Sequence, residues 1–313
     1  MKPSKHPPSD HSRQMQGSDN TGEAKKAPSA ALETESSPKE DILQNLPFSR
    51  QKLEKIIESL EDDITRGAWK NRNYVSTDLK LMPALVEQAN VKYSGLNLKF
   101  VDDPSDFARS VEKNINDGVN VARFLVYTND KWLHFSVIDQ RTIGGKTSVI
   151  FFESTTFDNT KSSLLAIRSQ LALQNLNLPN CRFSIVEMDI QRSSSECAMF
   201  SLALAKKLHT ESEKIEIMHQ KNIDGVLCEP NFPLPSDKVD MYLPASFYKH
   251  TQGRRRMGAY IKSNPDSEKK KINKKGETLT ERFTRNLVEL DGKSVSVSPH
   301  KKRIVEYKNV LKL

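Results

Sequence analysis

The chain has 313 residues, of which 36% are hydrophobic and 28% charged, and its formal net charge is +8 at pH 7. These fractions exclude a fully disordered chain, and no run approaches the ~20 apolar residues that a membrane helix needs, so we expect a soluble protein with no transmembrane segment. The N-terminus lacks an apolar h-region, which excludes a cleavable Sec-type signal peptide, and three cysteines in so long a chain fit a reducing compartment.

The first elements are predicted from composition and apolar spacing. Residues 1 to about 41 have almost no large apolar side chains to offset their ordering entropy, so we expect disorder there. Order is expected to begin with a helix that is capped by Ser49, carries apolar residues at helical spacing from 53 to 64, and stops at Gly67. A second helix is predicted over residues 82–93, with Pro83 in its first turn.

A sheet with helices is predicted next. Alternating apolar residues at 96–100 indicate a strand, and helical spacing over 107–115 indicates a helix. Strands are then expected at 123–127, 132–139 and 147–153, with a glycine-containing turn at 141–146. Residues 182–189 read as a buried strand, and helices are expected from Thr160, over 195–208 and over 213–223, before a Pro-rich stretch at 230–235. This order predicts an α/β (α+β) layer fold with a central mixed sheet and helices on its faces.

Cys197 is the candidate nucleophile. It lies just inside the start of a predicted apolar helix, where unpaired backbone N–H groups and the positive helix end stabilise a thiolate. Cys181 and Cys228 are interpreted as small buried residues. A thiolate nucleophile also needs a histidine to accept and return protons, and a third group to orient that histidine.

His134 is the candidate general base and acid among seven histidines. It is flanked by Leu133 and Phe135 in a predicted strand, which is typical of a rigid, half-buried side chain. His6 and His11 lie in the N-terminal arm expected to be disordered. The charged surroundings of His209, His219 and His300 are interpreted as solvated.

Glu153 and Gln191 complete the candidate site. Glu153 ends a buried apolar run, where a carboxylate is costly unless it is paired, and its strand should neighbour that of His134. Gln191 lies six positions before Cys197, so that its amide, with backbone N–H groups near the cysteine, would stabilise an oxyanion. The chain order His, acid, Gln, Cys is more specific than any of the four residues alone.

These motifs resemble the YopJ/AvrA family of type III secreted effector acetyltransferases, which have a cysteine-protease-like fold (C55 type) related to ubiquitin-like-protein proteases. The resemblance rests on His134, Glu153 after two phenylalanines, and residues 191–207, and extends through residues 248–253, 273–275 and 300–303. It spans about residues 50–313. Ala198 stands where the family usually has Gly, and since Ala is the better helix former, the departure leaves the helix undisturbed.

The resemblance implies a papain-like catalytic core and a basic helical regulatory region. Residues 1–45 would be a disordered secretion arm, residues 46–245 the catalytic domain, and residues 246–313 a regulatory region that packs with the N-terminal helices. It also implies delivery through a type III system into the host cell cytoplasm.

Acetyl transfer is the activity that the resemblance implies. The acetyl group would pass from acetyl-CoA to Cys197 and then to Ser, Thr or Lys of host kinases, typically MAP kinase kinases, with Ser193, Ser194 and Lys206 as candidate acetyl-CoA contacts. The residues alone leave a protease or deubiquitinase open, since a Cys–His pair forms an acyl-thioester that water or a side chain accepts. A non-enzymatic, anion-binding adaptor is a third possibility.

Positive charge is concentrated near the C-terminus. Residues 249–313 carry 18 Lys and Arg against 7 Asp and Glu, a net of +11, whereas residues 1–248 have a net of −3. This predicts a polyanion partner, and the scarcity of aromatic residues among the charges argues against nucleic acid. The resemblance implies inositol hexakisphosphate as an activator, autoacetylation of Lys249, and an anion pocket built from Lys249, His250, Arg282, Lys301, Lys302 and Arg303.

Overall fold

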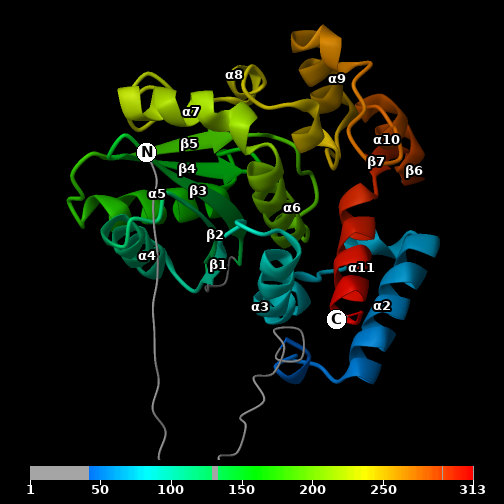
Figure 1. The fold of residues 1–313 in the computed structure, drawn as a ribbon. Helices are drawn as coiled ribbons and strands as arrows, with labels where there is room; N and C mark the ends of the chain where they lie inside the picture. The colour runs from blue at the N-terminus through cyan, green and yellow to red at the C-terminus, as the bar shows by residue number, and fades with distance from the viewer. Residues whose placement is uncertain (1–41, 129–132, 291, 313) are drawn as a thin grey trace, which may run out of the picture. The chain divides into compact units, whose positions relative to one another are not determined.

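Five strands form the central sheet of the computed structural model, in the order β1-β2-β3-β4-β5 (Figure 1). Strand β1 (Leu98–Val101) runs parallel to β2 (Val121–Tyr127), which is antiparallel to β3 (Phe135–Ile143). Strand β4 (Lys146–Glu153) is antiparallel to β3 and parallel to β5 (Cys181–Glu187). The mixed sheet predicted from the sequence is confirmed.

The structure describes residues 42–128, 133–290 and 292–312, all of which lie in one unit, Ser36–Leu313. The disorder expected for residues 1–41 and the start of the strand expected at residue 132 fall outside the described residues. In the part of the chain that is described, no helix is long and apolar enough to cross a bilayer.

Helices cover both faces of the sheet (Figure 1). Helices α4 (Pro104–Asn116) and α5 (Thr160–Gln174) lie on one face, and α6 (Cys197–Thr210) and α7 (Ser212–Asp224) on the other. The strands serve both layers because their side chains alternate in direction. Along β4, for example, residues 149 and 151 pack toward α4 and α5, while residues 150 and 152 join the larger core under α6.

A second helical layer joins the two ends of the described chain. Helices α2 (Arg50–Thr65) and α3 (Val75–Lys92) pack with α11 (Ser298–Val310), which also contacts α6. The remaining elements connect α7 to α11: α8 (Ser236–Val239), η2 (Ala245–Tyr248), α9 (Arg254–Ser263), η3 (Pro265–Ser267), α10 (Leu279–Arg285), β6 (Leu287–Leu290) and β7 (Lys293–Ser296); the short η1 (Ala68–Asn71) follows α2.

Several predicted boundaries are confirmed. The Ser49 side chain caps α2 by accepting from the backbone N–H of Lys52 at 3.3 Å, and α5 begins at Thr160. The turn between β3 and β4 is shorter than expected, because only Gly144 and Gly145 lie outside the strands, with φ of +56° and +75°. Two consecutive left-handed residues make a tight hairpin, and glycine adopts that conformation without strain.

The second helix was predicted too short. Helix α3 begins at Val75, so Pro83 lies in its middle and not in its first turn. The missed half contains Asp78, which is fully buried and bound by Arg303 and Tyr307 of α11. These contacts come from residues more than 220 positions away, which is why local pattern did not reveal them.

Candidate active site

Three elements bring the predicted catalytic residues together. Glu153 is the last residue of β4, and Cys197 is the first residue of α6. His134 lies one residue before β3, so the prediction that places it inside a strand is off by one position. The ladder nevertheless continues past it, because the N–H of Thr128 donates to the His134 carbonyl at 3.2 Å. The imidazole is therefore held by a rigid edge.

The Glu153 carboxylate is buried and fully hydrogen-bonded. Its Oε2 lies 2.9 Å from His134 Nε2 and accepts from Ser136 Oγ at 2.6 Å. Its Oε1 accepts from the backbone N–H and the hydroxyl of Thr155, at 2.8 and 2.9 Å. Burial alone would raise the pKa of Glu153, but the imidazole of His134 and these donors lower it. Glu153 is thus a fixed anion that orients the ring of His134.

His134 and Cys197 form the reacting pair. With Nε2 directed at Glu153, the other ring nitrogen is left for the sulfur of Cys197, which is close enough to affect the pKa of His134. Burial would lower the pKa of His134, but Glu153 and the interaction with Cys197 outweigh it and raise that pKa to about 10. The ring therefore holds a proton at neutral pH, beside a nucleophile that is only 1% exposed.

Gln191 borders a cavity of about 440 Å³ that also exposes His134, Ser193 and Ser194. Its carboxamide oxygen accepts from Ser154 Oγ at 2.8 Å, and its Nε2 donates to the Ser193 carbonyl at 2.5 Å. A primary amide has two N–H groups, so one remains for an oxyanion. The sequence predicted this neighbourhood, and the geometry leaves the oxyanion role of Gln191 as a proposal.

Lys206 lies apart from the other candidate acetyl-CoA contacts. Ser193 and Ser194 line the cavity. Lys206 lies in the second half of α6 and donates to Glu306 of α11 at 2.8 Å. Burial lowers the pKa of Lys206 to about 8 even though Glu306 opposes the shift. The structure thus places Lys206 with the basic residues of α11.

Lys249 belongs to a cluster of cations at the start of the basic region. Burial, together with nearby Lys302, Lys207 and Arg282, lowers its pKa to about 7. Within the described residues, its amine makes no hydrogen bond or ion pair. Lys207 was not predicted, and the only sequence signal for it was its place on α6 beside Lys206.

His250 is buried against the same cations. Its Nδ1 lies 2.9 Å from Ser298 Oγ, while its Nε2 is buried without a partner among the described residues. Burial, with Lys249 and Arg282, lowers the pKa of His250 well below its usual value. Arg282 donates to the Lys249 carbonyl at 3.0 Å, which ties α10 to this cluster.

Two of the predicted anion ligands occupy different settings. Lys301 is exposed and donates to Asn286 at 3.3 Å. Arg303 is fully buried, with its guanidinium on Asp78 at 2.9 Å and on the Ser195 carbonyl at 2.6 Å. The prediction that Arg303 lines an anion pocket is therefore corrected. It joins α11 to α3 and to the loop before Cys197.

Two histidines interpreted as solvated are in fact buried. His219 lies between Asp139 and Ser148, 2.9 Å from each, and is 0% exposed. His300, also 0% exposed, lies 3.0 Å from the Leu60 carbonyl and packs on Tyr74. Charged neighbours in the sequence misled the interpretation, because Glu216 and Lys301 are exposed on the same helices that bury the two imidazoles.

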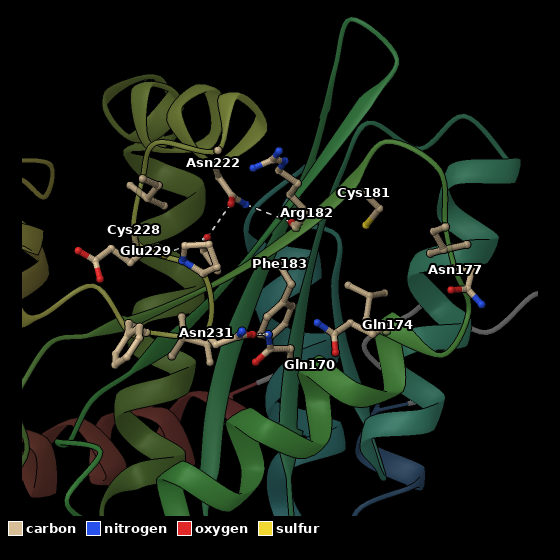
Figure 2. Close-up of a pocket in the computed structure, with 18 residues that line it drawn as sticks. Gln170, Gln174, Asn177, Cys181, Arg182, Phe183, Asn222, Cys228, Glu229 and Asn231 are labelled. Atoms are coloured by element: carbon tan, nitrogen blue, oxygen red, sulfur yellow. Dashed lines mark hydrogen bonds between the residues drawn. The ribbon is translucent and has the colours of Figure 1, made fainter.

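A second cavity, of about 370 Å³, lies along the outer edge of β5 (Figure 2). Cys181 and Cys228 line it and are half-buried, so they are more exposed than expected. Burial raises the pKa of Cys181 to about 11, and Cys228 donates to Ser184 Oγ at 3.3 Å. Among the described residues, no histidine lines this cavity beside the two thiols.

Comparisons with known proteins agree with this site. The model of the YopJ serine/threonine acetyltransferase family matches residues 53–309. The serine/threonine-protein acetyltransferase YopJ of Yersinia pestis is 49% identical over 266 residues, which cover 85% of this chain and 92% of that protein.

Solved structures extend the likeness to the fold. The structure of AvrA delL154 with IP6 and CoA matches with a TM-score of 0.82 at 48% identity, covering 85% of this chain and 100% of that one. The structure of HopZ1a with IP6 and CoA matches with a TM-score of 0.70 at 20% identity, over 88% and 98%, and supports the fold alone. This chain therefore belongs to the YopJ family of serine/threonine acetyltransferase effectors.

Proposed function

We propose that the protein moves an acetyl group from acetyl-CoA, through acetyl-Cys197, to Ser, Thr or Lys side chains of host signalling kinases, in particular MAP kinase kinases. Delivery through a type III system into the host cytoplasm belongs to the same proposal. The carrying observation is the Glu153–His134–Cys197 arrangement beside a cavity, in a chain 49% identical to an acetyltransferase.

Cys197 forms the covalent intermediate in the first half-reaction. The proton of the Cys197–His134 pair is held on the imidazole, which Glu153 keeps in place. The sulfur attacks the acetyl carbonyl, and the free N–H of Gln191 and the backbone N–H groups at the start of α6 stabilise the oxyanion. The carbon–sulfur bond to coenzyme A then breaks, and His134 returns the proton to the departing thiolate.

The second half-reaction reverses these roles. The acceptor hydroxyl or amine gives its proton to His134 as it attacks the thioester carbonyl. The bond to the Cys197 sulfur breaks, and the sulfur recovers the proton. The same chemistry with water would be hydrolysis, so what separates the transferase from a hydrolase is which acceptor reaches the thioester.

Inositol hexakisphosphate is the proposed activator, and the cation cluster fits it. Lys302, Lys207 and Arg282 pair with Glu306, Glu211 and Glu277, but Lys249 has no ion pair among the described residues. Its amine and the unpartnered Nε2 of His250 are therefore the free groups for a phosphate. We assign Lys249, His250, Arg282 and Lys302 to this site and add Lys207, while Lys301 lies at its margin near Arg282. AvrA, which is 48% identical, has been solved with IP6 and CoA, which supports both ligands here.

The proposed division of labour follows the chain. Residues 46–245 hold the triad, and residues 246–313 hold most of the cation cluster. Lys249 is also the proposed autoacetylation site, since an amine with a pKa of about 7 is largely neutral, and so nucleophilic, at slightly alkaline pH.

Intact-mass analysis tests the proposal. The purified protein is incubated with acetyl-CoA, with and without inositol hexakisphosphate. We expect an acetyl adduct on Cys197, which adds about 42 Da because an acetyl group replaces a hydrogen, and transfer to a kinase, both only when the anion is present. Cys197→Ala should abolish both. Hydrolysis of a peptide or ubiquitin substrate without any acetyl adduct would favour the hydrolase, and an effect on host signalling that survives Cys197→Ala would favour the adaptor.

A further inference from the structure

Gln252 packs against the loop of residues 190–196, which leads to Cys197. It belongs to the segment that follows η2, just past the cation cluster, and is 1% exposed. Its backbone N–H donates to the Ile190 carbonyl at 2.9 Å, so its main chain runs beside the start of the loop 190–196. The side chain is thereby aimed at the residues that precede Cys197.

The Gln252 carboxamide is fully used by that loop. Its Oε1 accepts from the backbone N–H groups of Arg192 and Ser193, at 2.6 and 3.0 Å. Its Nε2 donates to Ser193 Oγ at 3.0 Å and to Glu196 Oε2 at 2.6 Å. One amide thus supplies an acceptor to two backbone N–H groups of the loop and a donor to two of its side chains.

Glu196 makes this contact informative, because it adjoins Cys197 and takes no part in the proposed chemistry. Its carboxylate is 0% exposed, and its Oε2 also accepts from Ser193 Oγ. Its Oε1 has no hydrogen bond among the described residues, and the guanidinium of Arg303 is 3.9 Å away. Gln252 is therefore a main donor to a buried carboxylate, and a buried carboxylate is costly unless it is bound.

We propose that Gln252 is a positioning residue, which fixes the loop 190–196 and so sets the place of the Cys197 sulfur relative to His134. Gln252 follows Lys249 by three residues and His250 by two. A shift of the cation cluster would therefore move Gln252, and with it the loop that Gln252 binds. The inference deepens the proposed function, since it gives the catalytic loop a physical connection to the proposed anion site.

A charge swap tests the pairing. Gln252→Glu keeps the acceptor for the two backbone N–H groups but sets a second carboxylate against Glu196. We expect kcat to fall about 10- to 100-fold, as for loss of a hydrogen bond to a charged group, with the KM for acetyl-CoA little changed. The double variant E196Q/Q252E restores a donor–acceptor pair in the opposite sense, and should recover most of the lost rate.

Alkylation of Cys197 gives a readout that does not depend on acetyl transfer. The rate of carbamidomethylation by iodoacetamide, followed by intact mass, should change in Gln252→Glu and return toward the wild-type rate in the double variant. Gln140→Glu is the matched control, since Gln140 is also 0% exposed but bonds Asn114, far from the loop in sequence and in the sheet. It should lose stability and keep the wild-type alkylation rate.

The outcomes separate the two proposals. Wild-type kcat and alkylation in Gln252→Glu, or no rescue in a folded double variant, would overturn the positioning role. If Gln252→Glu does not fold, Gln252→Asn, which shortens the side chain without adding charge, should show the same effects to a smaller degree. A wild-type protein that is alkylated at Cys197 yet never acetylated overturns the proposed function and leaves the alkylation test of Gln252 intact.

Discussion

Two buried histidine–carboxylate pairs have nearly the same geometry and opposite properties. His134 and Glu153 meet at 2.9 Å, as do His219 and Asp139, and in each pair a serine contacts one of the partners. Yet the pKa of His134 is raised to about 10, whereas the pKa of His219 is lowered.

The carboxylate's other partners account for the difference. Asp139 is bound by two guanidinium groups, with Arg123 at 2.9 Å and Arg141 at 3.2 Å, so its charge is balanced without His219. Burial and those arginines then keep His219 neutral. Glu153 has only neutral donors besides His134, so the imidazole supplies the balancing charge. A histidine–carboxylate distance alone thus does not identify a catalytic histidine.

The largest expected effect comes from removing the negative charge of the carboxylate that holds the His134 ring. Glu153→Gln leaves His134 without its balancing anion and without a fixed tautomer, so we expect kcat to fall about 10³- to 10⁴-fold, with little loss of folded protein. Steady-state acetylation of a kinase and circular dichroism measure the two quantities. A variant that retains a tenth of wild-type kcat would contradict the assignment of Glu153.

The corresponding substitution in the second pair is expected to lower the stability of the fold. Asp139→Asn leaves Arg123 and Arg141 buried without an anion, so we expect about 3–5 kcal/mol less free energy of unfolding. Activity per folded molecule should stay at the wild-type level, as chemical denaturation and active-site titration can show. Loss of kcat in a folded Asp139→Asn protein would mean that the two pairs are coupled.

Lys249 extends the comparison to a half-buried cation that has no ion pair with a carboxylate among the described residues. Bound polyanion should raise its pKa from about 7, so binding at pH 8 takes up protons. Calorimetry in buffers of different ionisation enthalpy measures this proton uptake. Lys249→Met should reduce the uptake and should weaken the affinity for the polyanion about tenfold. Lys308→Met is the control, because Lys308 pairs with Glu61 on the exposed side of α11. Equal proton uptake in both variants would rule out Lys249 as the titrating group.

The smallest effect is a change in pH dependence. A histidine whose folded pKa is lowered contributes stability above its unfolded pKa near 6.5, and that contribution is lost as pH falls below it. His219→Gln should therefore flatten the acid side of the stability curve by up to ~1.4 kcal/mol per pH unit. The contribution of His134 has the opposite sign, since its raised pKa makes it fade as pH rises toward 10. An unchanged acid slope in His219→Gln would contradict the comparison.

The sequence by itself determined the sheet and most helices, and it predicted the grouping of His134, Glu153 and Cys197. Apolar alternation and helical spacing act over a few residues, and they located β2 to β5, α5 and α6. A carboxylate at the end of a buried strand is costly unless it is paired, and the start of a helix offers unpaired N–H groups to a thiolate, so Glu153 and Cys197 stood out there. The family resemblance, carried by the same motifs, was confirmed by the match over residues 53–309.

Only the tertiary structure decided which charged residues share an environment. Arg303 looked like one of several surface cations, but it binds Asp78, 225 positions away, and the Ser195 carbonyl. His219 looked solvated, but it bonds Asp139, 80 positions away. The contact between Gln252 and Glu196 joins residues 56 apart. Electrostatic balance depends on distance in space, which local sequence pattern does not encode, and that balance determines which buried charge is structural and which is catalytic.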